Sequence, residues 1–434
     1  MKPSSEKAKS ASKVSSRGSL EGRVPSLRFP GFEGEWKCQI FGSAFDFIPN
    51  NTLSRSELTH DNGSVKNIHY GDVLVKFGAV IDFEHDDVPF IANHNVSIAE
   101  RRLQDGDVVI ADTAEDEAVG KASEVVGLKG TYAESGLHTM ACRPRQRFAP
   151  RFMGYCLNSA AYHHRLLPLM QGIKVFSLSK SQISKTEIYI PYDEAEQQQI
   201  ADFLSLIDSR IAAQRKLVTL LKKQKRGLSN ALFSGKLRMV NDLKWKVYRL
   251  GDIVRRVTRK NGSASDVPLT ISAQHGLIDQ REFFSKSVAS ADMSGYYLLK
   301  QGEFAYNRSS SGDCPFGSIK RLERYAQGAV STLYICFEAI GDSDDSEFLK
   351  WYFDSFAWHR EVGMICAEGA RNHGLLNVPT EGFFDTKHLL PSDKEERKKM
   401  AMFMALEAAR CEHAECELAR LTELKAGFLQ QMFA

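Results

Sequence analysis

Side chains that could carry out catalysis are few and isolated in this sequence. Ser177 and Lys180 match an S-x-x-K pattern, but the partner motifs of enzymes that use it are absent. His85 next to two aspartates, and the pair His163-His164, are better interpreted as solvated positions than as metal ligands. No phosphate-binding glycine loop, dinucleotide fingerprint, H-E-x-x-H motif or Asn/Asp-Pro-Pro-Tyr/Phe tetrapeptide occurs. We therefore predict neither a catalytic site nor a metal site.

Binding chemistry is better represented. Arg, Lys, Asn and Gln can hydrogen-bond base edges when phosphate contacts position them. Residues of these types lie beside glycines and aromatic residues on expected loops, namely Lys66, His69, Tyr70, Lys76 and Lys174 in the first half and Asn307, Arg308, Arg371, Asn372 and His373 in the second. Gly172 and Gly369 are interpreted as backbone-turn residues. The basic run 222–226 could contact phosphates or could flank an acidic helix, and both interpretations stay open.

Composition bounds the class of protein. The chain has 434 residues, 43% hydrophobic and 26% charged, with a net charge of +3. This excludes global disorder and a collagen-like fibre, and no apolar run is long enough to span a membrane. Residues 1–27 predict a disordered tail, and because their start lacks an apolar core we expect no signal peptide and a cytoplasmic location. Eight cysteines without a C-x-x-C pair argue against a zinc site.

The segments that are expected to position the candidate residues occur twice in the sequence, 200 residues apart. Residues 190–234 and 390–434 share eleven identities without a gap. Each copy begins after a proline, has acidic residues in its next turn and contains no internal proline, which indicates a long helix. Apolar residues recur about every 3.5 positions, as in a coiled coil. The predicted seam is Leu204, Ile207, Ile211, Val218, Leu221, Leu228 and Leu232 in the first copy and Met404, Cys411, Leu418, Leu421, Phe428 and Met432 in the second.

Charge distinguishes the two helices. Residues 207–223 carry five basic residues and one acidic residue, whereas 407–423 carry two basic and five acidic residues. An antiparallel pair would bring these segments together, and complementary flanking charges favour that pairing over either helix with itself. We therefore predict one intramolecular antiparallel coiled coil. The second copy has a departure, Glu407, at a seam position.

Before each long helix we expect a domain of mixed α/β structure, and the two domains are related. Alternating runs at 72–77, 107–111, 187–190 and 333–337 predict strands, and 152–170 and 346–362 predict amphipathic helices. The predicted boundaries are a tail at 1–27, a first domain at 28–190, a central helix at 191–236, a second domain at 237–389 and a C-terminal helix at 390–434. The fold class is α+β with an approximate two-fold internal repeat.

Several short motifs resemble one family. They are Phe-Pro-Gly-Phe at 29–32, Asn-Ile-His-Tyr-Gly-Asp at 67–72, Glu-Gln-Gln-Gln-Ile-Ala-Asp-Phe-Leu at 196–204, Glu-Gly-Ala-Arg-Asn-His-Gly-Leu-Leu-Asn-Val at 368–378, and the endings at 225–228 and 425–428. Their order and the duplication resemble the specificity subunit of type I restriction–modification systems, over about 28–434.

The resemblance implies that the two domains are target-recognition domains and that each reads half of a bipartite DNA sequence. It also implies that the helices dock two modification (methyltransferase) subunits and that a restriction subunit completes the nuclease. S-adenosylmethionine would then lie on the modification subunit, and ATP and Mg on the restriction subunit. The resemblance also implies that the binding candidates named above contact double-stranded DNA. The target bases cannot be derived from one sequence.

Two other functions compete with this one. The chain could be a coiled-coil scaffold that holds two ligand-binding domains unrelated to DNA. It could also be a self-sufficient enzyme, although the missing methyltransferase tetrapeptide argues against methylation by this chain alone. A steep dependence of DNA affinity on salt would distinguish the first function from the scaffold, because binding to phosphates releases counterions.

Overall fold

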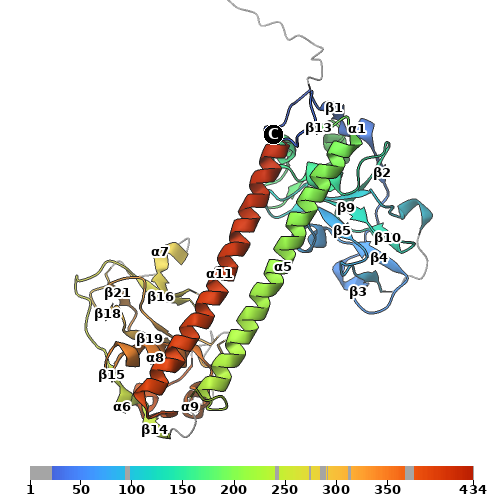
Figure 1. Cartoon of the computed structure of the whole chain (residues 1–434). Helices are drawn as coiled ribbons and strands as arrows, with labels where there is room; N and C mark the ends of the chain where they lie inside the picture. The colour runs from blue at the N-terminus through green and yellow to red at the C-terminus, as the bar shows by residue number, and fades with distance from the viewer. Residues whose placement is uncertain are drawn as a thin grey trace, which may run out of the picture. The chain divides into compact units, whose positions relative to one another are not determined.

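In this computed structural model, two long helices each contribute to two structural units (Figure 1). The helices are α5 (Glu194–Phe233) and α11 (Lys394–Met432). The structure describes residues 22–92, 98–239, 244–272, 275–283, 290, 292–310, 314–366 and 376–433. The first unit comprises Met1–Gln214 and Glu417–Ala434, and the second comprises Arg215–Cys416. Each unit therefore contains one part of each long helix.

An aspartate side chain accepts a backbone hydrogen bond at the N-terminus of each long helix. The Asp193 carboxylate accepts a hydrogen bond from the Ala195 N–H, and the Asp393 carboxylate accepts one from the Glu396 N–H, both at 2.8 Å. Each aspartate thus satisfies an amide that the first helical turn leaves unbonded. The helices consequently begin a few residues after the predicted starts at 191 and 390. Gly235, with φ +72°, follows the end of α5, as is common at helix C-termini.

The first unit contains two main sheets. The five-stranded sheet has the order β2 (Phe45–Ile48), β11 (Thr139–Pro144), β7 (Val108–Ala111), β9 (Ala122–Val126) and β5 (Val80–Asp82). The four-stranded sheet has the order β10 (Tyr132–Ser135), β4 (Val65–Ile68), β6 (Phe90–Ile91) and β3 (Leu58–Thr59). Two further pairs are β1 (Lys37–Ile40) with β13 (Glu187–Ile190), and β8 (Thr113–Ala114) with β12 (Phe176–Ser177). Every residue of β7 and β9 is buried, including the polar Ser123 and Glu124 of β9.

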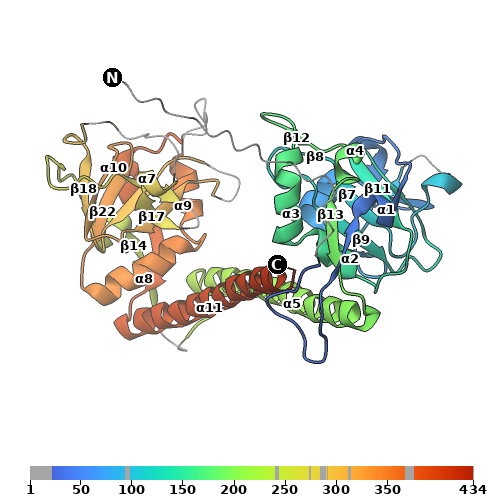
Figure 2. The same cartoon turned by 90° about the horizontal axis from the view of Figure 1, so that it is seen from above.

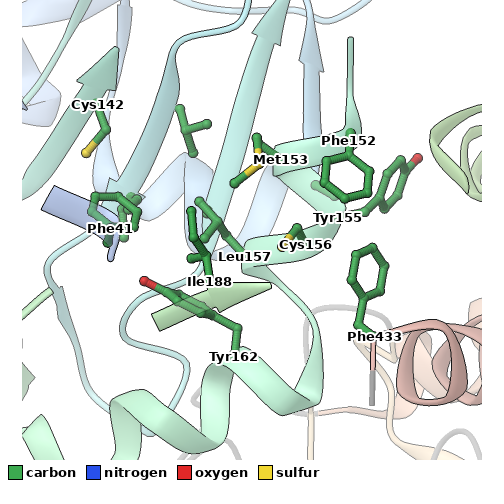
Figure 3. Close-up of a cluster of buried hydrophobic side chains, with 14 of the residues drawn as sticks. Phe41, Cys142, Phe152, Met153, Tyr155, Cys156, Leu157, Tyr162, Ile188 and Phe433 are labelled. Atoms are coloured by element: carbon green, nitrogen blue, oxygen red, sulfur yellow. The ribbon is translucent and has the colours of Figure 1, made fainter. Parts of the chain in front are cut away.

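Short helices complete the first unit. They are α1 (Phe41–Ala44), η1 (Arg55–Glu57), η2 (Asp72–Lys76), η3 (Ala99–Arg101), α2 (Phe152–Leu157), α3 (Ala160–Leu166), η4 (Leu167–Leu169) and α4 (Lys180–Ile183). All six residues of α2 are buried. Gly154 allows this close packing, because a Cβ there would lie 2.0 Å from the Ala79 carbonyl oxygen. Figure 3 shows α2 side chains facing Phe433, which follows α11.

One predicted strand is wrong. Residues 72–76 form η2, a π-helix, in which the Phe77 N–H donates to the Asp72 carbonyl five residues earlier. The alternation of apolar and polar residues suits a strand, but tertiary contacts determine this segment. The Lys121 ammonium donates to the carbonyl oxygens of Leu74 and Phe77 at 2.8 and 3.1 Å, and Arg55 pairs with Asp72 at 2.6 Å. Both contacts hold the turn from outside it.

The second unit has a related set of elements (Figure 2). Its four-stranded sheet has the order β15 (Val254–Arg256), β22 (Ile335–Ala339), β19 (Phe304–Asn307) and β20 (Ser318–Arg321). Three pairs are β14 (Trp245–Arg249) with β23 (Lys387–Pro391), β16 (Leu269–Ser272) with β17 (Gly276–Asp279), and β18 (Tyr297–Lys300) with β21 (Gln327–Val330). The helices are α6 (Leu250–Ile253), α7 (Gln280–Phe283), α8 (Ser343–Asp354), α9 (His359–Ile365) and α10 (Thr380–Asp385). Aromatic side chains such as Tyr306, Phe337 and Trp358 fill its core.

The internal repeat extends into both units. A tryptophan near the first strand of each unit donates its indole N–H to a glutamate of a long helix, Trp36 to Glu196 at 3.2 Å and Trp245 to Glu396 at 3.3 Å. The strand pair β1–β13 of the first unit corresponds to β14–β23 of the second, and both pairs are antiparallel. The same frame is thus built twice from different sequences.

Contacts between the long helices occur within each unit. In the first unit, Phe203 packs edge-on against Phe428 with ring centroids 4.9 Å apart, Asp208 pairs with Lys425 at 2.5 Å, and Arg210 lies 3.9 Å from Glu417. Residue numbers fall along α11 as they rise along α5, so this packing is antiparallel. In the second unit, Lys222 of the basic segment pairs with Glu415 of the acidic segment. The coiled coil and its charge pairing follow the prediction.

Burial follows the predicted seam. Each of its thirteen residues is buried or half-buried, whereas neighbours such as Leu206 and Leu406 are exposed. Glu407 is also buried, and its carboxylate pairs with Arg410 of the same helix at 2.8 Å. The basic run is largely engaged, because Lys225 lies 4.0 Å from Asp354 and Arg226 stacks 4.6 Å from the Phe356 ring. Among the described residues, no helix is long and apolar enough to cross a membrane.

Candidate nucleic-acid interface

The middle strands of both units end at comparable places. In the first unit β7 pairs antiparallel with β11, so the end of β7 lies beside the start of β11. In the second unit β19 pairs antiparallel with β22 in the same way. We call Tyr70, Asp112, Thr113 and His138 the first rim, and Asn307, Arg308 and Leu333 the second rim. Each rim joins a strand end to the turn before the neighbouring strand.

The strands that carry the rims have equivalent starts. Gly106 and Gly302 precede β7 and β19 with φ of +91° and +87°, values that favour glycine. The acidic residue after each glycine accepts a backbone hydrogen bond from three residues earlier, Asp107 from Gln104 at 2.7 Å and Glu303 from Lys300 at 2.8 Å. Each carboxylate also pairs with an arginine, at 2.8 and 3.0 Å respectively. The starts of the two strands are therefore held by the same set of contacts, namely a backbone hydrogen bond and an ion pair with arginine.

The side chains of the first rim contact one another. The Thr113 hydroxyl donates to the Asp112 carboxylate at 2.8 Å. His138 Nδ1 lies 3.4 Å from that carboxylate, and the His138 ring meets Tyr70 edge-on with centroids 5.3 Å apart. Backbone bonds hold the cluster, because the Asp112 N–H donates to the His138 carbonyl at 3.1 Å. Strand β12 adds to this edge by pairing with β8, which begins at Thr113 (Figure 2).

The second rim is held by its arginine. The Arg308 guanidinium donates to the Leu333 carbonyl at 2.9 Å and to the Val378 carbonyl at 3.1 Å. The Asn307 carbonyl oxygen of the side chain accepts from the Ser309 N–H at 3.1 Å. Leu333 itself is exposed. Both predicted residues thus lie on the rim, but Arg308 uses its donors to join three segments of the second unit.

The predicted residues of the first half take different positions. His69 is only 8% exposed, its Nδ1 accepts from the Gly71 N–H at 3.2 Å, and burial lowers its pKa, so it supports a turn inside the protein. The Lys66 ammonium lies 5.6 and 5.4 Å from the Phe83 and Phe90 rings. Both side chains thus have contacts within their own unit, and their contact with DNA stays a prediction.

Three further predictions have other outcomes. Lys76 pairs with Asp87 at 3.1 Å, and hydrogen bonds from His60 and then from Lys76 lower the pKa of that carboxyl group. Lys174 is exposed on the loop between η4 and β12, where Gly172 has φ +126°. Arg371, Asn372, His373 and Gly369 lie outside the described residues. Among the described residues, the structure brings together Tyr70 and His69 of the first set, with ring centroids 4.6 Å apart, and Asn307 with Arg308 of the second.

Sequence reasoning missed three members of the first rim. Asp112 and Thr113 follow a buried strand, which is a usable signal for a strand-end site. His138 carried no such signal, because a histidine in a turn is common and its backbone conformation cannot be derived from spacing. Within the described residues, no group of three His, Cys, Asp or Glu side chains is placed to hold a metal ion.

Comparison with known proteins relates this geometry to a family. Residues 84–223 match the model of the type I restriction modification DNA specificity domain. Among curated proteins, the chain is similar to a protein of Methanocaldococcus jannaschii named as a proposed type I restriction enzyme MjaX specificity subunit. The two are 27% identical over 166 residues, which cover 37% of this chain and 36% of the relative. The aligned segment thus spans about a third of that relative's length.

Two solved structures share the fold over nearly the whole chain. The S subunit of a type I restriction–modification system from M. genitalium matches with a TM-score of 0.53 and 14% identity, covering 95% of this chain and 99% of that one. A structure concerned with complex assembly and conformational transition of the type I restriction–modification system matches with a TM-score of 0.56 and 15% identity, covering 94% and 99%. These likenesses establish the fold.

The fold and the matched domain define the class. This chain has the two-domain, coiled-coil fold of the two solved structures, and its segment 84–223 matches the type I restriction modification DNA specificity domain. The predicted resemblance to specificity subunits of type I restriction–modification systems is confirmed over the segments that match the family model and the curated relative, and the solved structures share the fold over nearly the whole chain. Three first-rim residues, Asp112, Thr113 and His138, lie inside the matched segment.

Proposed function

We propose that this chain is the specificity subunit of a type I restriction–modification enzyme and that each rim reads one half of a bipartite, asymmetric DNA target. The observation that carries this proposal is the duplicated frame with different rims. In one unit Asp112 and Thr113 follow strand β7 and His138 precedes the neighbouring strand β11, whereas Asn307 and Arg308 stand at the end of the equivalent strand β19 in the other. A shared frame with different polar side chains suits two readers of different base sequences, because base-edge contacts specify sequence.

The proposed reaction belongs to partner subunits. Modification subunits with bound S-adenosylmethionine would methylate adenine at N6, and a restriction subunit with ATP and Mg would cleave unmodified DNA. The chain's own residues would bind and orient the DNA duplex. A metal or methyl donor is not assigned to either rim.

The long helices support two docking places for modification subunits. Leu206 of α5 in the first unit is 70% exposed, and Leu406 of α11 in the second unit is 60% exposed. These two residues occupy the same repeat position, 200 residues apart. Exposed large apolar side chains at equivalent positions suit two copies of one partner. We therefore expect two modification subunits per chain.

The test uses the chain co-expressed with its modification subunit. We expect the purified complex to have a mass that corresponds to two modification subunits and one specificity subunit, and to bind DNA with an affinity that falls steeply with salt. Mapping of methylated bases should give one motif in two unequal parts separated by unspecified positions. DNA affinity without salt dependence, together with an absence of methylation, would instead favour a scaffold unrelated to DNA.

A further inference from the structure

His138 has a left-handed backbone conformation. It lies in the turn between β10 and β11 with φ +54°, a region that few non-glycine residues adopt and in which histidine, asparagine and aspartate are enriched. Within the described residues, only Lys129 and Arg151 are other non-glycine residues with positive φ. A glycine would adopt this conformation without strain. Non-glycine residues in this region concentrate at functional sites.

The His138 ring is held in one orientation by its neighbours. Its Nδ1 lies 3.3 Å from the Thr113 hydroxyl and 3.4 Å from the Asp112 carboxylate. Tyr70 packs against the ring nearly perpendicularly, at an interplanar angle of 80°. In the neutral ring, the carboxylate favours the tautomer that carries its proton on Nδ1, and Nε2 is then an acceptor. The side chain is 47% exposed, and within the described residues no hydrogen bond from Nε2 is found.

We propose that His138 is a specificity-determining residue of the first half-site, with Nε2 accepting a hydrogen bond from the exocyclic amino group of an adenine or cytosine in the major groove. This inference rests on the proposed function. The chemistry follows from the fixed acceptor, since N6 of adenine and N4 of cytosine are the base amino donors exposed in that groove. Asp112 and Thr113 are positioning residues, because they orient the ring without needing to contact the base.

The second rim provides a contrast. Its corresponding turn before β22 presents Leu333, whose carbonyl oxygen is held by Arg308. The described residues of the second unit include no non-glycine residue with positive φ. The histidine with positive φ is therefore found in the first rim only, among the described residues. If it served only to close the turn of the repeated frame, an equivalent residue would be expected in the second rim.

The test compares two histidine variants in the co-expressed complex with modification subunits. His138→Gly removes the ring and suits the left-handed backbone, so the turn should fold. His85→Gly is the matched control, because His85 also pairs with an aspartate, Asp82, at 3.1 Å. Asp82 ends β5 opposite Val126, at the other end of the five-stranded sheet from the first rim. Methylated bases are mapped for the wild type and for both variants.

We expect His138→Gly to relax one position in one half of the methylated motif, with a roughly 10- to 100-fold loss of discrimination there. The other half and the His85→Gly motif should not change. An unchanged motif for His138→Gly, or a uniform fall in methylation at all sequences, would overturn the inference. His138→Ala, which also removes the ring, repeats the test if the glycine variant is unstable. A wild-type complex without any bipartite motif would instead contradict the proposed function.

Discussion

The junction between globular domain and long helix is built twice with different chemistry. In the first unit the Tyr162 hydroxyl lies 2.9 Å from the Thr186 hydroxyl, and the buried Ile188 lies two residues further along β13. In the second unit His388 replaces that isoleucine at the repeat position. Its Nδ1 lies 2.7 Å from the Tyr352 hydroxyl, and its Nε2 lies 2.7 Å from the Thr386 hydroxyl.

The backbone at the two junctions is nearly the same. Each threonine hydroxyl donates to a carbonyl three residues earlier at 2.7 Å, and each threonine carbonyl accepts from the first residue of a short helix, Phe41 at 2.8 Å and Leu250 at 2.9 Å. The two junctions thus share their backbone hydrogen bonds, whereas one side chain, isoleucine or histidine, changes the polarity of the core. The two rims likewise share their strand arrangement and differ in their side chains.

The largest expected effect concerns the phenylalanine at the end of each long helix and the unit in which it packs. Phe433 packs 5.8 Å from both Trp36 and Phe152 in the first unit, whereas its repeat equivalent Phe233 packs 5.7 Å from Phe348 in the second. Phe433→Ala should destabilise the first unit, and Phe233→Ala the second, by about 3–5 kcal/mol each, because each leaves a cavity. Hydrogen exchange of the two units in each variant measures this.

The control for this pair is Leu206→Ala, which removes an exposed side chain and should change neither unit by more than about 0.5 kcal/mol. Equal acceleration of exchange in both units by either phenylalanine variant would contradict the separate packing.

The next effect concerns His388 in the second unit. Burial lowers the pKa of His388 to about 4, so between pH 6.5 and pH 4 the unfolded chain binds a proton that the folded unit does not. Its contribution to stability is present above pH 6.5 and falls by about 2 kcal/mol between pH 7 and pH 5. His388→Ile should remove this loss, although Tyr352 and Thr386 lose their partner and the variant is less stable at pH 7.

Urea unfolding followed by tryptophan fluorescence measures this effect, since Trp245, Trp351 and Trp358 belong to the second unit. Burial also lowers the pKa of His359 to about 4, so part of the acid dependence should remain in the variant. An acid dependence identical to that of the wild type would show that His388 is not the group that titrates.

The smallest effect has the opposite sign and lies in the first unit. Burial raises the pKa of Glu124 to about 7, even though the N–H groups of Arg151 and Gly154 donate to its carboxylate at 2.6 and 2.9 Å. The folded unit therefore keeps a proton that the unfolded chain has released above pH 4.5, and stability falls as pH rises from 4.5 to 7. Glu124→Gln should remove this loss but also one acceptor, for a net gain of about 1 kcal/mol at pH 7.

Limited proteolysis of the first unit at pH 5.5 and pH 7.5 compares the Glu124→Gln variant with the wild type. The wild type should be cut faster at pH 7.5 than at pH 5.5. This difference should exceed the one that the protease shows on an unfolded reference protein between the same pH values. A variant that retains this difference would assign it to another group.

The sequence predicted the long helices well because two independent patterns coincide there. The 3.5-residue spacing identifies the seam, and the opposite charges of the two helix segments select the antiparallel pairing that Asp208 with Lys425 and Lys222 with Glu415 display. These patterns are local, so they can be derived without knowledge of the tertiary structure.

The rim residues were less predictable because a side chain's destination depends on distant segments. Lys66 lies between aromatic rings that follow it by 17 and 24 residues, and Arg308 reaches a carbonyl 70 residues away. A lysine or arginine beside glycine indicates a loop but not the direction of its charged group. The left-handed conformation of His138 likewise follows from the turn that joins β10 and β11 and not from its residue type.

The central claim is that each rim reads one half of the target. The most direct test replaces residues 28–190 by the same region of a relative with a different first domain, and maps methylated bases in cells that supply the modification subunit. We predict that one half of the methylated motif changes, while the other half and the spacing are retained. A change in both halves, or a motif that does not change at all, would contradict the claim.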